Sequence, residues 1–391
     1  RCSRERPVAR RLRYTRCRIG RAGGKRNGGE MRIGINAALT GAGEGYRQTG
    51  ISRYIGELVS SLRPQLAVDD DLVLFGNDSR LISERPGARI AWEQTVLPAA
   101  AIAKGVDVLH GPLSVVPAIP GFRKVVTVHD LAFVRYPEQI ARSRRAYLVA
   151  GTRLGARIAD RIIAVSTKTA DDLMAWLDVP ADRIMVIPLA PSPKVSRLIG
   201  DALERFKVTM GLQRPYLLAV GTLEPRKNLP FLLDAFAAVK DTIPHDLVLV
   251  GPEGWLNGPF RERLERLKLG DRVRLTGFVS DEDLGAWYSG ADLFAFPSIY
   301  EGFGLPTVEA MSCGAPVLTS SSSCFPEVVG DAGVMVAPDD RAGWSEAIVR
   351  ILRDAVLRDD LRARGLARAA GFSWERTAAQ TYDIYRTVAN A

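Results

Sequence analysis

Two glutamates, Glu301 and Glu309, stand with seven residues between them in the stretch PSIYEGFGLPTVEA, directly after a short apolar segment. Gly302 and Gly304 allow the backbone to turn sharply and to approach a ligand closely. Pro306 suits the first turn of a helix, and a helix start binds anions through its free N–H groups. Carboxylates accept hydrogen bonds from hydroxyl groups, so the stretch predicts a ligand that carries both hydroxyls and phosphate. The alternative is a strand–loop–helix joint with two solvated glutamates.

A pair of cations, Arg226 and Lys227, lies in a second stretch, GTLEPRKN, which also follows an apolar segment and precedes a helical pattern. Arg can bind a diphosphate through two parallel hydrogen bonds, and Lys binds it as a point charge. This turn therefore predicts a diphosphate site. The alternative is a solvated basic turn.

The elements that must position these residues alternate between strand and helix. The apolar patterns predict strands at Arg32–Asn36, Leu72–Phe75, Val106–His110, Lys124–His129, Arg161–Val165, Arg183–Ile187, Tyr216–Val220, Asp246–Val250, Arg272–Leu275, Leu293–Phe296 and Ala315–Thr319. Helical patterns fall between or after them at Ser52–Leu62, Glu138–Ala159, Lys168–Leu177, Asn228–Val239, Arg261–Leu267, Asp281–Tyr288, Pro306–Ser312 and Ser373–Val388. Apolar strands that alternate with helices indicate α/β architecture with parallel sheets covered on both faces.

The length of 391 residues suits two domains. We expect two doubly wound, Rossmann-like domains, at residues 31–200 and 201–375, joined near Leu189–Gln213. Ligands of such sheets bind at the carboxyl ends of the strands, so the cleft between the two domains is the expected site.

These two stretches resemble motifs of a known family. Glu301 and Glu309 form a Glu-x7-Glu pattern that is similar to the signature of retaining glycosyltransferase family 4, which has the GT-B fold. Gly221–Asn228 resembles the diphosphate loop of that family, and further matches are VHD at 128–130, AVS at 164–166 and TGFV at 276–279. The resemblance covers the chain from about Met31 to its C-terminal helix. It implies an acceptor-binding first domain, a nucleotide-sugar-binding second domain, and a helix at 376–391 that crosses back to the first domain.

The resemblance also implies roles for single residues. Glu309 would hold the ribose hydroxyls of the donor nucleotide. Arg226 and Lys227 would neutralise the diphosphate, including the charge that develops as it leaves. His129 would reach the donor sugar from the first domain, and Gly50 would open a helix whose N-terminus faces the phosphates.

Further implied contacts surround the same donor. Glu301, with the backbone amides of Phe303, Gly304 and Leu305, would hold the donor sugar and phosphate. Phe278 and Val279 would lie near the base. Gly221 and Thr222 belong to the diphosphate loop, and many family members have Arg where this chain has Thr222, so Arg226 must replace it for a firm phosphate grip.

The stereochemistry and the lack of a metal follow from the same resemblance. The acceptor would attack from the face that the leaving group departs, and a diphosphate oxygen would accept the acceptor's proton. The sequence has no paired Asp-x-Asp of the metal-dependent sugar transferases, and the Asp69–Asp71 run is typical of a solvated turn. We therefore expect a nucleotide-sugar as co-substrate and neither a cofactor nor a metal.

Three histidines occur in the chain. His129 follows a hydrophobic strand and precedes an Asp, which is where sites are built, although a buried structural histidine is the alternative. His110 also ends a strand and is a weaker candidate for the cleft. His245 stands between Pro244 and Asp246 and is typical of a turn.

The positive charge of the chain is confined to one end. Residues 1–30 hold ten Arg and one Lys against Glu5 and Glu30, which accounts for the whole net charge of +9, so the remainder nets zero. This arm is not expected to be part of the folded body, and we expect no nucleic-acid partner. The arm has no apolar core of a signal peptide, and the four Cys form no CxxC pair, so the sequence predicts a cytoplasmic enzyme.

A second basic segment lies inside the predicted helix Glu138–Ala159. The basic residues on or near this helix are Arg142, Arg144, Arg145, Arg153, Arg157 and Arg161. One interpretation is a peripheral membrane contact at the inner face, which would give access to a lipid-linked acceptor. The other is a solvated helix face.

The EPRKN sequence is similar to that of family members that act on mannose or related hexoses in polysaccharide assembly. The sequence therefore predicts hexosyl transfer, with GDP-mannose the favoured donor, to a saccharide or lipid-linked acceptor. Two alternatives stay open, namely a catalytically silent sugar-nucleotide-binding scaffold of the same fold and a GT-B sugar-nucleotide epimerase.

Overall fold

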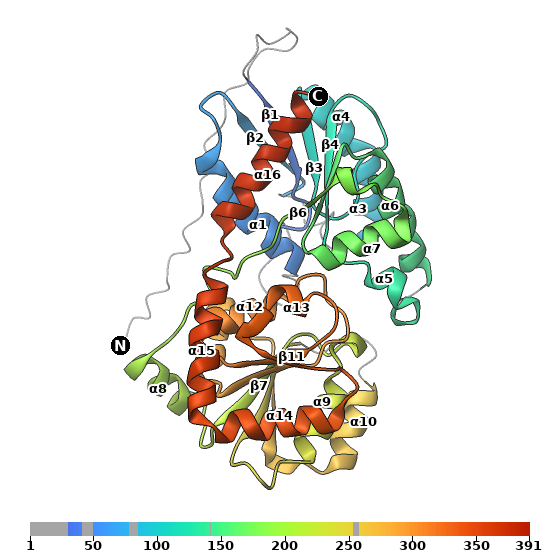
Figure 1. Ribbon diagram of the computed structural model, residues 1–391. Helices are drawn as coiled ribbons and strands as arrows, with labels where there is room; N and C mark the ends of the chain where they lie inside the picture. The colour runs from blue at the N-terminus through green and yellow to red at the C-terminus, as the bar shows by residue number, and fades with distance from the viewer. Residues whose placement is uncertain (1–29, 41–49, 78–84, 141, 253–257) are drawn as a thin grey trace, which may run out of the picture.

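The computed structural model describes residues 30–40, 50–77, 85–140, 142–252 and 258–391. Two lobes lie one above the other, each built on a parallel sheet with helices on both faces (Figure 1). All of the predicted arm at residues 1–30 except Glu30 lies outside the described residues, as do the segments 41–49, 78–84 and 253–257.

The first sheet has the strand order β2-β1-β3-β4-β5-β6. Its strands are β1 (Arg32–Asn36), β2 (Asp71–Phe75), β3 (Val108–Gly111), β4 (Arg123–Val128), β5 (Arg161–Ala164) and β6 (Ile184–Val186). The helices of this lobe are α1 (Gly50–Leu62), α3 (Pro86–Gln94), α4 (Val96–Ala103), α5 (Ala132–Arg135), α6 (Arg142–Ile158) and α7 (Thr167–Leu177).

Successive side chains along the strands of the first sheet pack on opposite faces of that sheet. Val125 and Ile163 pack with Tyr54 of α1, whereas Val126 and Ile162 pack on the opposite side with α5, α6 and α7. Because successive side chains of a strand point to opposite faces, strands that are apolar throughout bury both.

The second sheet has the strand order β12-β11-β10-β7-β8-β9. Its strands are β7 (Tyr216–Val220), β8 (Asp246–Val250), β9 (Val273–Gly277), β10 (Leu293–Phe296), β11 (Val317–Ser320) and β12 (Val334–Val336). The helices of this lobe are α8 (Gly200–Thr209), α9 (Leu229–Ala237), α10 (Gly258–Leu267), α11 (Asp281–Gly290), α12 (Leu305–Ser312), α13 (Phe325–Val328), α14 (Arg341–Arg353) and α15 (Ala355–Ala369).

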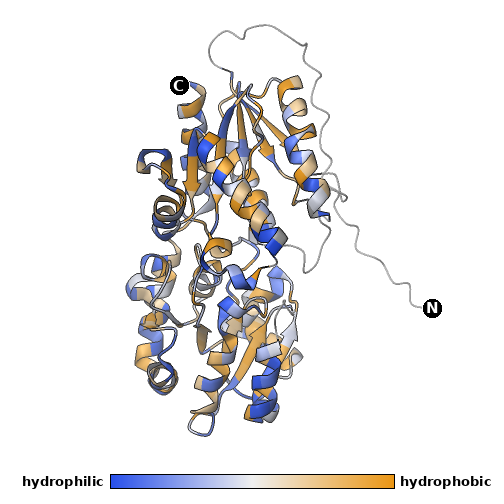
Figure 2. Ribbon diagram, turned by 90° about the vertical axis from the view of Figure 1, so that its right-hand side faces the viewer, coloured by the Kyte–Doolittle hydropathy of each residue, from blue (hydrophilic) through white to orange (hydrophobic). Residues whose placement is uncertain are grey.

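The final helix, α16 (Trp374–Ala389), leaves the second lobe and lies along the first (Figure 1). It packs against α1 and against strands β3, β4 and β5. Tyr385 and Val388 of α16 are buried in the same apolar cluster as the first sheet. Coloured by residue hydropathy, the ribbon is largely apolar along the strands and alternates between apolar and polar along the helices (Figure 2).

Candidate active site between the two sheets

The carboxyl ends of both sheets point toward the junction of the lobes. His129 follows β4 of the first sheet, whereas Gly221 follows β7 and Glu301 follows β10 of the second. A Cβ atom on Gly302 would lie 1.6 Å from the carbonyl oxygen of His129, so only glycine permits this approach of the two domains. The predicted site residues of the two domains therefore face one another across a narrow junction.

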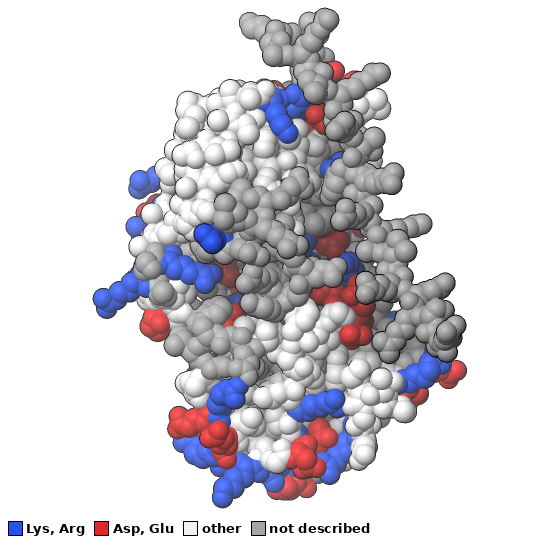
Figure 3. All heavy atoms as spheres, turned by 180° about the vertical axis from the view of Figure 1, so that it is seen from behind, with Lys and Arg blue, Asp and Glu red and all other residues white. Residues whose placement is uncertain are grey.

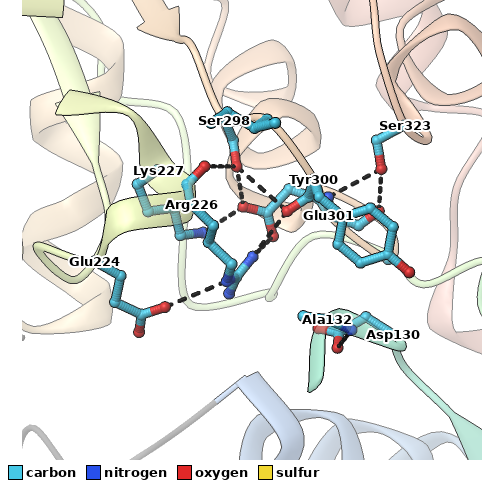
Figure 4. A network of polar contacts seen from close by, with 12 residues as sticks. Asp130, Ala132, Glu224, Arg226, Lys227, Ser298, Tyr300, Glu301 and Ser323 are labelled. Atoms are coloured by element: carbon cyan, nitrogen blue, oxygen red, sulfur yellow. Dashed lines mark hydrogen bonds and ion pairs between the residues drawn. The ribbon is translucent and has the colours of Figure 1, made fainter. Parts of the chain in front are cut away.

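Glu301 is the centre of a buried polar network (Figure 4). Its Oε1 atom accepts hydrogen bonds from Lys227 Nζ and from the Ser298 hydroxyl, each at 2.7 Å. Its Oε2 atom lies 2.7 Å from Nη1 of Arg226, which also donates to the carbonyl oxygen of Tyr300. The structure thus brings Arg226, Lys227 and Glu301 together, as their predicted common role requires.

The two cations decide the charge of Glu301. Burial opposes ionisation, but Arg226 and Lys227 outweigh it and lower the pKa of Glu301 to about 2. Burial, aided by the neighbouring Arg226, lowers the pKa of Lys227 in turn. Arg226 keeps a second carboxylate partner, since its Nε atom lies 3.2 Å from Glu224. Glu301 and Glu224 therefore balance the charges of Arg226 and Lys227.

Glu309 lies one helical turn into α12 and is 2% exposed. Its Oε1 atom is 2.8 Å from Nη1 of Arg53, a residue of α1 in the first domain. Its Oε2 atom accepts a hydrogen bond from the Tyr288 hydroxyl at 3.3 Å. Burial raises the pKa of Glu309 to about 7, with Arg53 opposing the shift and Asp281 adding to it. Both carboxylate oxygens of Glu309, the residue expected to bind the ribose, are therefore bonded to protein groups in this structure.

The loop between the two glutamates has the backbone that the sequence predicts. Gly304 has a φ of +73°, a left-handed conformation that favours glycine, and α12 begins at the next residue. The amides of the first turn of a helix have no carbonyl partner within the helix, which leaves that of Leu305 available to an anion. Pro306 has no N–H, and the amide of Thr307 donates to the carbonyl oxygen of Gly304 at 2.8 Å. Phe303 is buried and packs edge-on against Phe372 at 5.5 Å, so its side chain anchors the loop.

The backbone of the predicted diphosphate loop, Gly221–Asn228, is also closely packed. Gly221 has a φ of +145°, and a Cβ atom on Gly251 would lie 2.1 Å from its carbonyl oxygen. Thr222 follows on a half-buried turn and accepts a hydrogen bond from the amide of Glu224 through its carbonyl. Arg226 and Lys227 form a short 3-10 turn (Pro225–Lys227) that aims both cations at Glu301.

The remaining predicted donor contacts lie around this centre. Gly50 is exposed and is the first residue of α1. Phe278 follows β9 with 49% of its surface exposed, which leaves a ring face available for stacking, and Val279 packs partly on the core. Their roles in donor binding stay predictions.

His129 is held in one tautomer. Its Nε2 atom lies 3.0 Å from the carbonyl oxygen of Pro112, which can only accept, so Nε2 carries the hydrogen. Burial lowers the pKa of His129, and the ring of Tyr54 packs edge-on against it at 4.8 Å. His129 is therefore a neutral imidazole whose Nδ1 atom is an acceptor.

The other two histidines are structural. His110, the weaker cleft candidate, is fully buried between the Tyr385 hydroxyl of α16 at 2.6 Å and the Thr127 hydroxyl at 2.8 Å. Burial lowers its pKa to about 3. His245, expected in a turn, is instead buried and lies 3.1 Å from the carboxylate of Asp292.

Sequence reasoning missed the residues that join the two domains. Tyr300 donates to Asp172 of α7 at 2.8 Å and accepts from the amide of Leu131. Glu327 of α13 accepts from both the amide and the hydroxyl of Thr167, at the start of α7. These partners are more than a hundred residues apart in the sequence, so no local pattern could pair them.

The described residues contain no group of three or more His, Cys, Asp or Glu side chains arranged to hold a metal ion. Among the helices within those ranges, none is both long enough and apolar enough to cross a membrane.

Known proteins resemble this chain in sequence and in fold. The family model described as Glycosyltransferase Family 4 matches residues 50–190, and the one described as Glycosyl transferases group 1 matches residues 214–354. The O-antigen chain mannosyltransferase B of Escherichia coli is 37% identical over 267 residues, which are 68% of this chain and 70% of that protein.

Solved structures share the architecture. Sucrose-phosphate synthase from Thermosynechococcus elongatus aligns with a TM-score of 0.72 at 22% identity, over 91% of this chain and 98% of that one. HepE of Anabaena, in complex with UDP-glucose, aligns with a TM-score of 0.71 at 18% identity, over 91% and 100%. The predicted GT-B fold is thus confirmed, and with the sequence matches it follows that this chain is a glycosyltransferase belonging to family 4.

Proposed function

We propose that this glycosyltransferase moves a hexose, with mannose favoured, from GDP-mannose to a saccharide or lipid-linked acceptor in cell-surface polysaccharide assembly. The observation that carries the proposal is the pairing of Arg226 and Lys227 with Glu301 at the carboxyl ends of the second sheet. The choice of mannose is supported by the relative in Escherichia coli, whose name describes an O-antigen chain mannosyltransferase. A nucleotide-sugar donor is supported by the UDP-glucose complex of HepE.

The site residues act in donor binding and leaving-group stabilisation. Arg226 and Lys227 place two positive charges where the diphosphate departs, in a buried setting where charge interactions are strong. Glu301 turns toward the sugar hydroxyls when the diphosphate takes over its cations. The acceptor hydroxyl attacks the anomeric carbon from the face that the diphosphate leaves, so the new C–O bond replaces the broken one with retention of configuration. A diphosphate oxygen accepts the proton of that hydroxyl, and no metal takes part.

We further propose that the enzyme works in the cytoplasm, with a peripheral contact to the inner face of the membrane and no nucleic-acid partner. Two observations support this placement. Cys313 and Cys324 are buried free thiols, which suit a reducing compartment. Basic side chains project from the flank of the first domain, on the side of α5 and α6 (Figure 3).

A thermal-shift panel with GDP, UDP, ADP and their common sugar conjugates, without added metal, tests the donor proposal. A ligand that binds only the folded state raises its stability by RT ln(1 + [L]/Kd), so the true donor stands out. We expect GDP-mannose to give the largest shift and Glu309→Ala to abolish it. A shift of equal size in the variant would contradict the ribose role of Glu309.

Product analysis separates the alternatives. A transferase converts GDP-mannose only with an acceptor present, an epimerase releases a new sugar without one, and a silent scaffold binds the donor without turnover. Activity that EDTA abolishes and Mn²⁺ restores would contradict the metal-free mechanism.

A further inference from the structure

Arg53 reaches from the first domain into the predicted ribose subsite of the second. It lies in the first turn of α1, and the two ends of its guanidinium bind different carboxylates. Its Nη1 atom is 2.8 Å from Glu309, and its Nη2 atom is 2.6 Å from Asp281 at the start of α11. A single side chain thus ties α1 to two helices of the other domain.

This contact leaves Glu309 no free surface for a ligand. Arg53 occupies one carboxylate oxygen, Tyr288 occupies the other, and only 2% of the residue is exposed. Ribose hydroxyls need a carboxylate oxygen at hydrogen-bond distance. Arg53 must therefore leave Glu309 before a nucleotide can use that residue.

Arg53 leaves part of its guanidinium outside the two ion pairs. Its Nε atom is buried and has no hydrogen-bond partner among the described residues. A buried donor without a partner lowers the net stability of the bridge.

We infer that Arg53 competes with the donor nucleotide: it closes the ribose subsite by binding Glu309 and Asp281, and donor binding displaces it from Glu309. The inference rests on the proposed function, in which Glu309 holds the ribose. Arg53 is a positioning residue in this account, because it acts through Glu309 and touches neither sugar nor phosphate.

The proposed competition should change the apparent affinity for the nucleotide by a measurable factor. The apparent affinity of a ligand falls by the fraction of molecules in which its site is open, so a bridge that is closed in about nine of ten molecules weakens binding about tenfold. Removal of the bridge should therefore strengthen nucleotide binding, whereas a residue that contacts the donor would weaken it when removed.

Calorimetric titration with GDP distinguishes these outcomes. We expect Arg53→Gln to lower the Kd for GDP by about three- to tenfold. Arg53→Lys, which keeps the charge but cannot span two carboxylates, should fall between Arg53→Gln and the wild type. Asp281→Asn, which loosens the second anchor, should lower the Kd in the same direction by a smaller factor. The matched control is Arg157→Gln, an exposed arginine of the same domain.

The variants also separate failure of this inference from failure of the proposed function. If Glu309→Gln binds GDP as the wild type does, Glu309 is not the ribose ligand and the proposed function is wrong at this residue. If Glu309→Gln binds weakly and both Arg53 variants bind with an unchanged or higher Kd, Arg53 does not compete and the inference alone is overturned. Circular dichroism and melting temperature establish that each variant is folded, and Arg53→Lys serves if Arg53→Gln is not.

Discussion

Glu301 and Glu309 belong to one loop and helix, both are buried, and their pKa values nevertheless move in opposite directions. Glu301 faces two cations of its own domain, which lower its pKa to about 2. Glu309 lies beside one cation, Arg53 of the other domain, and the carboxylate of Asp281 opposes its ionisation. The effect of burial therefore dominates, and the pKa of Glu309 rises to about 7. The difference follows from the number of positive charges within ion-pair distance.

Stability should therefore depend on pH through Glu309 between about pH 5 and 8. The folded carboxyl keeps its proton to a higher pH than the usual 4.5, so its contribution to stability is complete below that value and is lost as pH rises through about 7. We expect a rise in pH from about 5 to 8 to lower the free energy of unfolding of the wild type by about 3 kcal/mol at most, relative to that of Glu309→Gln. Urea unfolding of both proteins across this range measures the difference.

Glu301→Gln provides the control. Its lowered pKa means that the wild-type carboxylate stabilises the fold above about pH 4.5 and loses this effect only as pH falls toward 2. The stability difference between wild type and Glu301→Gln should hence stay constant from pH 5 to 8. A Glu309→Gln difference that is equally flat would show that Glu309 is ionised throughout.

At the scale of elements, α6 stands out because it has five arginines and no acidic residue. Arg142, Arg145 and Arg153 line a depression of about 410 Å³ together with Ala146, Val149 and Ala150. Arg142, Arg144, Arg153 and Arg157 are exposed, and no ion pair joins them to other residues in the described parts of the chain. The face is therefore suited to an anionic surface.

Vesicle co-sedimentation tests this face. Each Lys or Arg near an anionic membrane contributes about 1 kcal/mol, so Arg142→Gln with Arg153→Gln should weaken binding to phosphatidylserine vesicles by about 30-fold. A chain that begins at Met31 is used, so that the arginines of residues 1–30 do not contribute. Arg205→Gln with Arg266→Gln in the second domain is the charge-matched control, and equal loss in both double variants would contradict a contact through α6.

Elements with a strong local pattern could be predicted from the sequence. The strands Tyr216–Val220 and Leu293–Phe296 have the predicted bounds because they are short apolar runs bounded by turn residues. Strand β12 was missed, since it has three half-buried residues at the edge of the sheet and no alternation. Helices α14 and α15 were also missed, because charged residues interrupt their apolar positions.

Some residues of the candidate site could likewise be predicted from the sequence, and others could not. Arg226, Lys227 and Glu301 could be predicted because each lies in a short segment between the end of an apolar strand and the start of a helix. Arg53 could not, because an arginine in an amphipathic helix is ordinarily solvated and its partner is 256 residues away. Contacts between domains depend on how the two sheets are placed, which local sequence does not encode.

At the scale of the whole molecule, several polar contacts cross the junction of the two domains. Besides Arg53, the junction contains Tyr300 with Asp172 and Glu327 with Thr167. Glu327 accepts from the first amide of α7, where the positive end of the helix dipole adds to the attraction. Contacts of this type can open and reform, as a cleft that must admit a donor requires.

Glu327→Ala should consequently shift the protein toward a more open arrangement. The loss of its hydrogen bonds to Thr167 should weaken the closed state by about 1–2 kcal/mol, which is roughly a five- to thirtyfold change in the ratio of closed to open molecules. Small-angle X-ray scattering would record an increased radius of gyration without ligand. Glu346→Ala, an exposed position on α14, is the control, and identical scattering of the two variants would argue against a role of Glu327 in closure.

The return of α16 to the first domain has a consequence for the order of biosynthesis. The strands of the first sheet end at Val186, and the helix that covers one of its faces begins only at Trp374. At about 5–20 residues per second, a ribosome needs roughly 10–40 seconds to make the intervening chain. During that interval the side chains that later receive Tyr385 stay open to water or to a chaperone. The first domain to be made is thus the last to be completed.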